Sequence, residues 1–267
     1  KRILTGSPIT KSPLDLYTQC EFLKQGLLGF TNYFVFRARY SVMKQIQVVG
    51  NKNIMIPIYY QNLDELEEKI KQFSYRVKKD ECLDLPPKVY EKRFIALSKQ
   101  QQDIYNDLKQ TCRVIIEDEM VSYTNKLTEI SKLNQVCCGF LKTDDGDTKT
   151  LPNSKLNELI NILDEIDGKV IIWATFVDTI KTIVNTLKTK FGSDSTVEIY
   201  GATTLDARNS AIENFQQNKD VRFLVGNPTV AGYGLTLTAA TTVIYFNNSF
   251  NLEVRQQSED RAHRHGQ

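Results

Sequence analysis

The stretch that decides the fold reads KVIIWA at residues 169–174. Apart from the first lysine it is apolar and rich in β-branched residues, without the polar alternation of a half-exposed strand. Such runs are typical of strands buried on both faces, and these belong to parallel sheets covered by helices. The stretch therefore predicts an α/β fold.

Strand and helix patterns alternate around this stretch from residue 154 onward. Leucines and isoleucines at helical spacing predict a helix that begins at Ser154 and continues to Ile166. The further predicted helices are Val177–Lys190, 207–218 and 252–263, and the further predicted strands are 196–200, 221–225 and 241–246. We therefore expect a parallel sheet with helices on both faces.

Ligands of such sheets bind beyond the carboxyl ends of the strands. The residues at these predicted ends are Thr175, Gly201, Thr229 and Asn247.

The first half of the chain predicts a mainly helical region. Its predicted elements are a short strand at Lys1–Leu4, a helix entered at Ser12-Pro13, a helix at Asn62–Ile70, a strand at Val89–Ile95, and helices at 100–108 and 114–133, with Ser98 as a cap. The acidic run at 144–147 lacks the spacing of a calcium loop, so we interpret it as a solvent-exposed turn.

Composition excludes several classes of protein. The chain has 267 residues, 41% of them hydrophobic, with a net charge of +2. There is no apolar run of 18 residues, so we expect no membrane partner. Its five cysteines form no CxxC pair and its two histidines lie far from them in sequence, so we expect neither a metal site nor a disulfide scaffold. Free thiols favour an intracellular location.

The sequence ends on a basic segment that could bind phosphate. Arg261 and Arg264 are three residues apart and would share one face of a helix. Two guanidinium groups on one face can hold a phosphate, because arginine stays charged and donates in a planar fork. The alternative interpretation is a solvated basic helix end.

Several stretches together resemble one family, the Swi/Snf-type ATPases, which are superfamily-two DNA translocases. LTGSPI at 4–9 resembles the family's LTGTPI, and LPPK at 85–88 resembles its linker. GATT at 201–204, with Arg208 and Phe215, resembles its G-S-T element. AGYGLTLTAA at 231–240 resembles AGGxGLNLTAA, and QSEDRAHRHGQ at 257–267 resembles QAEDRAHRIGQ. These last two motifs are the most specific.

The resemblance implies two RecA-like lobes with ATP and Mg²⁺ between them. Residues 1–23 would be the tail of the first lobe, 24–152 helical protrusions and a linker, and 153–267 the second lobe. No GxxxxGK[ST] motif occurs in the chain, so we expect this chain alone to be inactive. The implied partners are double-stranded DNA and the first lobe of the same protein, and we expect a monomer.

The resemblance also implies roles for single residues. Arg261 and Arg264 would be arginine fingers facing the γ-phosphate. ATP binding or coupling would involve Gln257, Asp260, Gly232, Gly234, Thr5 and Gly6. DNA backbone contacts would come from Thr175, Gly201, Thr203, Thr204 and Thr229.

The sequence also departs from the family pattern. Tyr233 stands in place of a usual glycine, Thr236 in place of a usual asparagine, and residues 246–251 lack an aspartate–tryptophan pairing. These departures favour an alternative function, a degenerate RecA-like module that binds DNA or protein without hydrolysing ATP. A nuclease or an RNA helicase of the same superfamily is a third possibility.

Overall fold

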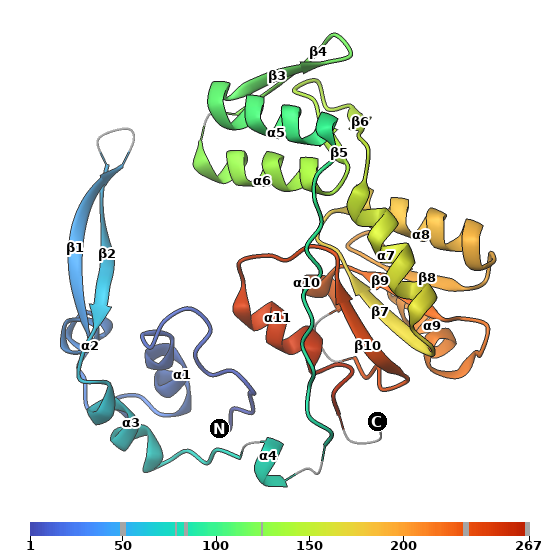
Figure 1. Cartoon of the computed structure of the whole chain (residues 1–267). Helices are drawn as coiled ribbons and strands as arrows, with labels where there is room; N and C mark the ends of the chain where they lie inside the picture. Colours follow the sequence, from blue (N-terminus) through green and yellow to red (C-terminus); the bar gives the residue numbers. More distant parts are fainter. Residues whose placement is uncertain (49–51, 78, 83–84, 124, 232–234, 265–267) are drawn as a thin grey trace. The chain divides into compact units, whose positions relative to one another are not determined.

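The structure of the chain is a computed structural model that describes residues 1–48, 52–77, 79–82, 85–123, 125–231 and 235–264 (Figure 1). The chain divides into two compact units, Lys1–Leu83 and Asp84–Gln267, which are described separately below. No helix within these described ranges is long and apolar enough to cross a membrane.

The first unit combines short helices with one long hairpin. Its elements are α1 (Asp15–Leu23), α2 (Tyr33–Tyr40), β1 (Ser41–Val48), β2 (Lys52–Tyr60), α3 (Leu63–Lys71) and α4 (Lys79–Cys82). The fully buried Phe36 and Tyr40 form the centre of its core. The Tyr40 hydroxyl donates to Glu65 Oε1 at 3.0 Å, which ties α2 to α3. The predicted helix at 62–70 is thus confirmed as α3, whereas the predicted strand at Lys1–Leu4 is wrong.

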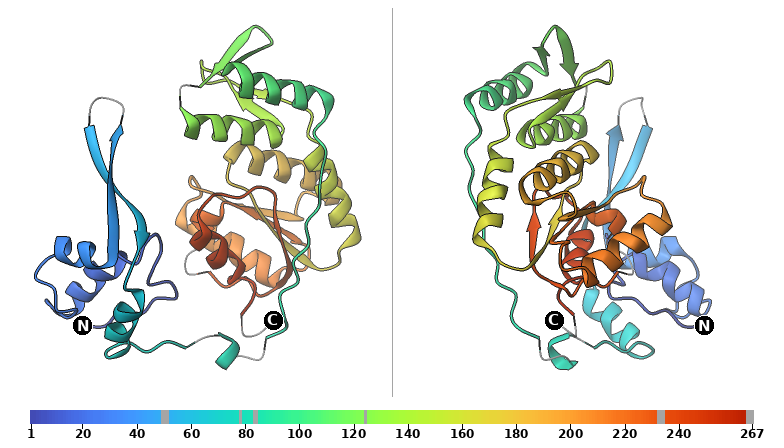
Figure 2. Two further views of the ribbon diagram at one scale, coloured as in Figure 1. Left: turned by 60° about the vertical axis from the view of Figure 1, so that its left-hand side comes forward. Right: turned by 90° about the vertical axis from the view of Figure 1, so that its right-hand side faces the viewer.

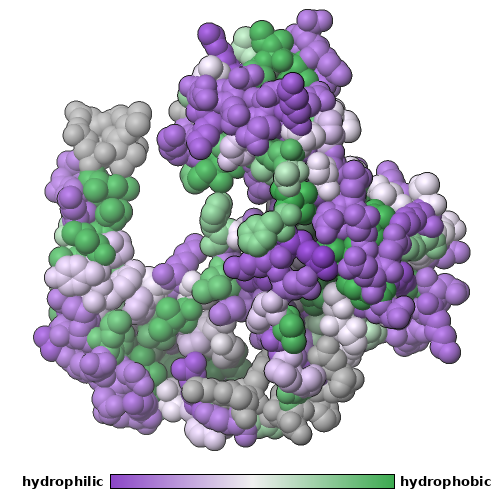
Figure 3. All heavy atoms as spheres, in the orientation of Figure 1, coloured by the Kyte–Doolittle hydropathy of each residue, from purple (hydrophilic) through white to green (hydrophobic). Residues whose placement is uncertain are grey.

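The hairpin of β1 and β2 was not predicted from the sequence. Pro57 lies within β2, where a proline argues against a strand, but it faces the point at which the register shifts between Val42 and Met43. Proline is tolerated at such a bulge because no ladder hydrogen bond is lost there. The apolar side chains of Ile54, Ile56 and Ile58 are exposed along the hairpin, as the green surface in Figure 3 shows.

The second unit begins with an extended segment and a small helical layer. The elements of this layer are α5 (Lys99–Thr111), β3 (Arg113–Ile116), β4 (Glu119–Ser122), α6 (Lys126–Cys137), β5 (Phe140–Lys142) and β6 (Thr148–Thr150). Ser98 begins α5 as predicted: its hydroxyl accepts from Gln101 N–H, and the Gln101 side chain accepts from Ser98 N–H. This reciprocal capping box satisfies two backbone donors that the helix itself leaves open. The predicted acidic turn lies between β5 and β6.

Two predictions for this region are wrong. The predicted helix at 114–133 is a hairpin, β3 and β4, followed by α6. Its two-residue turn, Glu117-Asp118, has φ of 48° and 67°, a conformation usually occupied by Asn-Gly. The predicted strand at Val89–Ile95 is extended but pairs with none of the described strands. An alternating pattern makes a strand only where a neighbouring strand completes the hydrogen bonds.

The remainder of the second unit is the predicted parallel sheet. Its elements are α7 (Ser154–Glu165), β7 (Lys169–Trp173), α8 (Val177–Phe191), β8 (Thr196–Ile199), α9 (Leu205–Gln217), β9 (Phe223–Gly226), α10 (Pro228–Ala231), β10 (Ala240–Tyr245) and α11 (Leu252–Glu259). The strand order is β10-β7-β9-β8, and all pairs are parallel. The RecA-like α/β fold is therefore confirmed, with the decisive stretch as a central strand.

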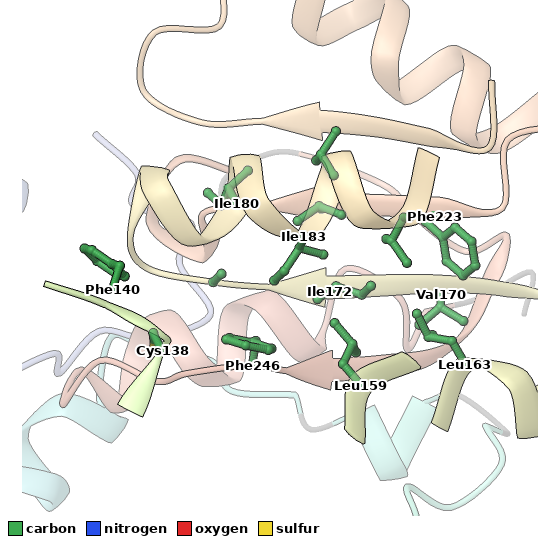
Figure 4. Packing of buried hydrophobic residues seen from close by; sticks show 14 residues of the cluster. Cys138, Phe140, Leu159, Leu163, Val170, Ile172, Ile180, Ile183, Phe223 and Phe246 are labelled. Atoms are coloured by element: carbon green, nitrogen blue, oxygen red, sulfur yellow. The ribbon is translucent and has the colours of Figure 1, made fainter. Parts of the chain in front are cut away.

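The side chains of β7 alternate between two cores. Val170 and Ile172 face α7 and α8, where Figure 4 shows them among Leu159, Leu163 and Ile183. Ile171 and Trp173 face the other side, where α9 and α10 pack. Both cores exclude water from residues 170–173 of β7, which explains why these four residues are all apolar.

Candidate functional site

The two arginines lie beyond the end of α11 and not on one of its faces. The helix ends at Glu259, four residues before the predicted end at 263. Arg261 N–H and Ala262 N–H then make short-range bonds to Ser258 O and Glu259 O, which form turns. The reason is tertiary: Leu237 N–H donates to Arg261 O at 2.9 Å, and Ala262 is buried in the core of α9 and α10. The expectation of a shared helical face is therefore wrong.

Both arginines nevertheless contact the same segment, residues 235–236. Arg261 is buried, with 8% of its surface exposed, and its Nη1 donates to Leu235 O at 3.3 Å. Arg264 is half-buried, and its Nη1 donates to the Thr236 hydroxyl at 3.1 Å. Tertiary contacts thus bring together the two most specific motifs of the sequence. The candidate glycines Gly232 and Gly234, together with Tyr233, lie outside the described residues.

The other two residues of this motif have separate partners. Gln257 Nε2 donates to Glu253 Oε1 at 2.8 Å, one turn earlier on α11. Asp260 Oδ1 lies 3.2 Å from Lys88 Nζ, so this carboxylate faces the extended segment that precedes α5. We call residues 259–264 the arginine turn. Asp260 therefore connects this turn to residues 85–88, which the sequence analysis interprets as a linker.

Residues 86–90 form a strap along this turn. Lys88 Nζ also lies 3.2 Å from Glu259 Oε2, and the Tyr90 hydroxyl donates to the same oxygen at 2.8 Å. Pro86 O lies 2.8 Å from His263 Nε2. The described residues 85–98, which precede α5, form the extended trace in Figures 1 and 2. Sequence reasoning recognised LPPK only as a linker, because nothing local predicts which helix a linker will contact.

The ion pairs of the strap shift the pKa values of their members. Burial by itself raises the pKa of Glu259, but hydrogen bonds from Arg255, Tyr90 and Lys88 outweigh burial and hold it below its ordinary value. Burial by itself lowers the pKa of Lys88, but contacts with Asp260 and Glu259 raise it above its ordinary value. Both groups are therefore charged at neutral pH, where the ion pair between Lys88 and Glu259 is fully formed.

Acid is expected to remove the stabilisation that Glu259 provides. Because its folded-state pKa is lowered, this stabilisation is present above the ordinary pKa of 4.5 and is lost as the pH falls through the folded value. The measurement is the free energy of unfolding of the wild type minus that of Glu259→Gln, by urea, from about pH 7 to about pH 3. The difference should shrink as the pH falls, and a difference independent of pH would contradict this assignment. Glu213→Gln, at an exposed position of α9, is the control.

The carboxyl ends of the strands form a second group of candidate residues. Asn247 Oδ1 accepts from Thr175 N–H at 2.9 Å, and Asn247 Nδ2 donates to Thr175 Oγ1 at 2.5 Å. Asn227 Nδ2 donates to Thr175 O at 3.0 Å, and Asn227 Oδ1 accepts from Thr229 N–H at 2.9 Å. These two asparagines connect the ends of three neighbouring strands, β10, β7 and β9. A polar residue directly after a buried strand is the signal that could have identified Asn227.

The backbone N–H of Thr175 is consequently used within the protein. The hydroxyl oxygen of Thr175 accepts from Asn247 Nδ2, and a hydroxyl has only one hydrogen of its own to donate. That hydrogen therefore takes no part in the bond with Asn247. Thr203 and Thr204 behave in the same way, since their hydroxyls accept from Tyr200 N–H at 3.0 Å and Ala207 N–H at 3.3 Å.

The remaining candidate residues are Gly201, Thr229, Thr5 and Gly6. Gly201 and Thr229 are exposed, and a Cβ added to Gly201 would meet no atom within 4 Å. Thr5 and Gly6 lie in the first unit, where the Thr5 hydroxyl accepts from Ser7 N–H at 3.1 Å and Gly6 is likewise surrounded by open space. The packing of the described residues therefore does not require glycine at either position.

Comparisons with known proteins show which family the chain resembles. The Helicase conserved C-terminal domain family matches residues 154–266, and the SNF2-related domain family matches residues 1–140. The chain is 30% identical over 269 residues to an uncharacterized ATP-dependent helicase of Mycoplasma genitalium, covering 99% of this chain and 24% of that protein. It is 27% identical over 284 residues to a putative ATP-dependent helicase/translocase of Bacillus subtilis, with 99% and 28% covered.

A solved structure adds a further likeness. The Sulfolobus solfataricus SWI2/SNF2 ATPase core in complex with dsDNA is 26% identical, with a TM-score of 0.48, and the alignment covers 99% of this chain and 54% of that one. The chain spans about a quarter of the length of the two curated relatives. Because the SNF2-related match covers more than half of the sequence, the chain belongs to the SNF2-related, Swi/Snf-type family, and it carries a helicase C-terminal domain.

Proposed function

We propose that this chain supplies the second RecA-like lobe of an ATP-dependent motor that translocates along double-stranded DNA. In this proposal residues 153–267 are the lobe, residues 24–152 are protrusions and linker, and residues 1–23 are the tail of the first lobe. The observation that carries it is the pair of arginines held on residues 235–236, with the Arg264 side chain still partly accessible.

The two arginines would have different tasks toward the nucleotide. Bound ATP, with Mg²⁺ on its phosphates, would supply the phosphoanhydride whose hydrolysis drives the motor. Arg264 is the better candidate for the finger that neutralises charge on the γ-phosphate, since its guanidinium is bonded to a hydroxyl at the surface. The buried Arg261 would hold residues 235–237 in place beside it. Gln257 and Asp260 would couple this turn to the rest of the lobe, as would Gly232 and Gly234.

The strand ends would hold the DNA. Thr175, Thr203 and Thr204 each have a hydroxyl oxygen that accepts a hydrogen bond within the protein. Each of these hydroxyls would donate its own hydrogen to a phosphate oxygen of the DNA. Phosphate oxygens accept such hydrogen bonds, and contacts of this kind position the duplex without reading its sequence. Gly201 and Thr229 at the same edge would let the backbone of the DNA approach closely.

The proposal is tested by ATP hydrolysis and by DNA affinity in the full-length protein. We expect ATPase activity that double-stranded DNA stimulates, and no activity from this 267-residue chain alone. Thr175→Val should weaken duplex binding about 5- to 10-fold, because one hydrogen bond contributes about 1 kcal/mol. The loss should be equal for DNA of different sequences. Thr186→Val removes an exposed hydroxyl of α8 and is the matched control.

Three results would contradict the proposal. DNA binding without any ATPase activity in the full-length protein would favour the alternative of a degenerate binding module. ATPase activity in the isolated chain would show that the division between two lobes is wrong. Stimulation by RNA in place of DNA would favour an RNA helicase of the same superfamily.

A further inference from the structure

The strap at residues 86–90 contacts both ends of the turn that carries the arginines. At the start of the turn, Lys88 Nζ lies 3.2 Å from both Glu259 Oε2 and Asp260 Oδ1, and Tyr90 donates to Glu259. At its far end, Pro86 O lies 2.8 Å from His263 Nε2. Arg261 lies between these two points of attachment. The contacts join residues about 170 positions apart, since Lys88 and Glu259 are separated by 171.

The turn depends on such contacts because it is not a continuation of α11. Beyond Glu259 the backbone bonds are short-range and two of them are long, at 3.4 Å for Arg261 N–H and 3.3 Å for Ala262 N–H. A turn with weak internal bonds needs outside contacts to keep one conformation. The Lys88 side chain is 28% exposed and the Glu259 side chain 15% exposed, so solvent screens their ion pair less than it would a surface pair.

We propose that Lys88 and Tyr90 are positioning residues for ATP hydrolysis. They hold Glu259 and Asp260 in place, and through these residues they hold Arg261 and Arg264 in the orientation that faces the phosphate. The inference rests on the proposed function, because it assigns the arginines to the nucleotide.

The test compares three variants in the full-length protein with bound DNA. Lys88→Met keeps the length of the side chain but removes its charge, and Lys88→Arg restores a cation of similar reach. We expect Lys88→Met to lower kcat about 10-fold with KM for ATP and DNA affinity nearly unchanged, because arginine fingers act mainly on the transition state. Lys88→Arg should recover most of kcat. Lys92→Met, at an exposed position of the same segment, should behave as the wild type.

A double variant separates positioning from general stabilisation. If Lys88 acts through the arginine turn, Lys88→Met should have no further effect on kcat in an Arg264→Ala background. An additive loss in the double variant, or a wild-type kcat in Lys88→Met with only a lower melting temperature, would overturn the proposal.

A second measurement needs no turnover. Hydrogen exchange of the amides at 259–264 should become faster in Lys88→Met and remain unchanged in Lys92→Met. Unchanged exchange in Lys88→Met would overturn the proposal even if the enzyme is active. Faster exchange in a full-length protein that lacks DNA-stimulated ATPase would instead show that the strap holds the turn but that the proposed function is wrong.

Discussion

Arg264→Ala is expected to lower the DNA-stimulated kcat of the full-length protein by roughly 10³-fold or more, while DNA affinity stays unchanged. The transition state of phosphoryl transfer spreads negative charge over the γ-phosphate oxygens, and a guanidinium there contributes most when it is already positioned. Arg264 meets this condition because Thr236 accepts from its Nη1 and the turn is anchored by Arg261 O. Steady-state ATPase assays with saturating duplex DNA, and separate binding assays without hydrolysis, are the measurements.

Two companion variants make this result specific. Arg264→Lys retains the positive charge but loses the planar fork, so we expect it to recover only part of the activity. Arg113→Ala removes an exposed arginine of β3, in the helical layer of the same unit, and should leave kcat unchanged. Normal turnover in Arg264→Ala would rule out Arg264 as the arginine finger. Arg261 would then be the remaining candidate.

Trp173→Ala is expected to lower the free energy of unfolding of the second unit by about 3–5 kcal/mol. Trp173 is fully buried at the end of the central strand, and it packs in the core of α9 and α10. The absence of a side chain on Gly226 makes room for its ring, since a Cβ there would lie 3.2 Å from a ring carbon. Removing the indole leaves a cavity that the rigid sheet cannot close.

Urea unfolding followed by circular dichroism measures this loss, because the substitution removes the only tryptophan and with it the natural fluorescence probe. Trp173→Phe fills much of the same volume and should cost clearly less. If Trp173→Ala lowered the free energy of unfolding by less than about 1 kcal/mol, the Trp173 side chain would not be closely packed at the end of β7.

The sheet could be predicted from the sequence more fully than the helical layer. Each of its strands and helices is recognised from a pattern of fewer than 20 consecutive residues. Most of these elements begin and end within two residues of the predicted bounds. The hairpin at β3 and β4 could not be predicted, since Glu117 and Asp118 adopt positive φ without the glycine or asparagine that signals such a turn. The alternation at 89–95 predicted a strand, but a strand also needs a partner, which no local pattern supplies.

The candidate site divides in the same way. The motifs with Arg261 and Arg264 were identifiable from residue type and order, whereas the contact of both arginines with residues 235–236 is visible only in the structure. The location of both arginines beyond α11 was not predictable from a helical pattern. The helix ends before them, and Leu237 N–H, which is far away in sequence, donates to Arg261 O. The contacts between Thr175 and Asn247 were equally unpredictable, since the two residues are 72 positions apart.

The sequence by itself determined the α/β class, the central place of β7, the capping of α5 and the identity of the arginine motif. Each of these depends on the order and spacing of neighbouring residues, which act over one or two helical turns or along one strand. Only the tertiary structure decided where α11 ends, that Asn247 bonds to Thr175, and that Lys88 and Tyr90 contact Glu259. These features depend on ion pairs and hydrogen bonds between segments far apart in the chain, whose partners are selected by the packing of the whole unit.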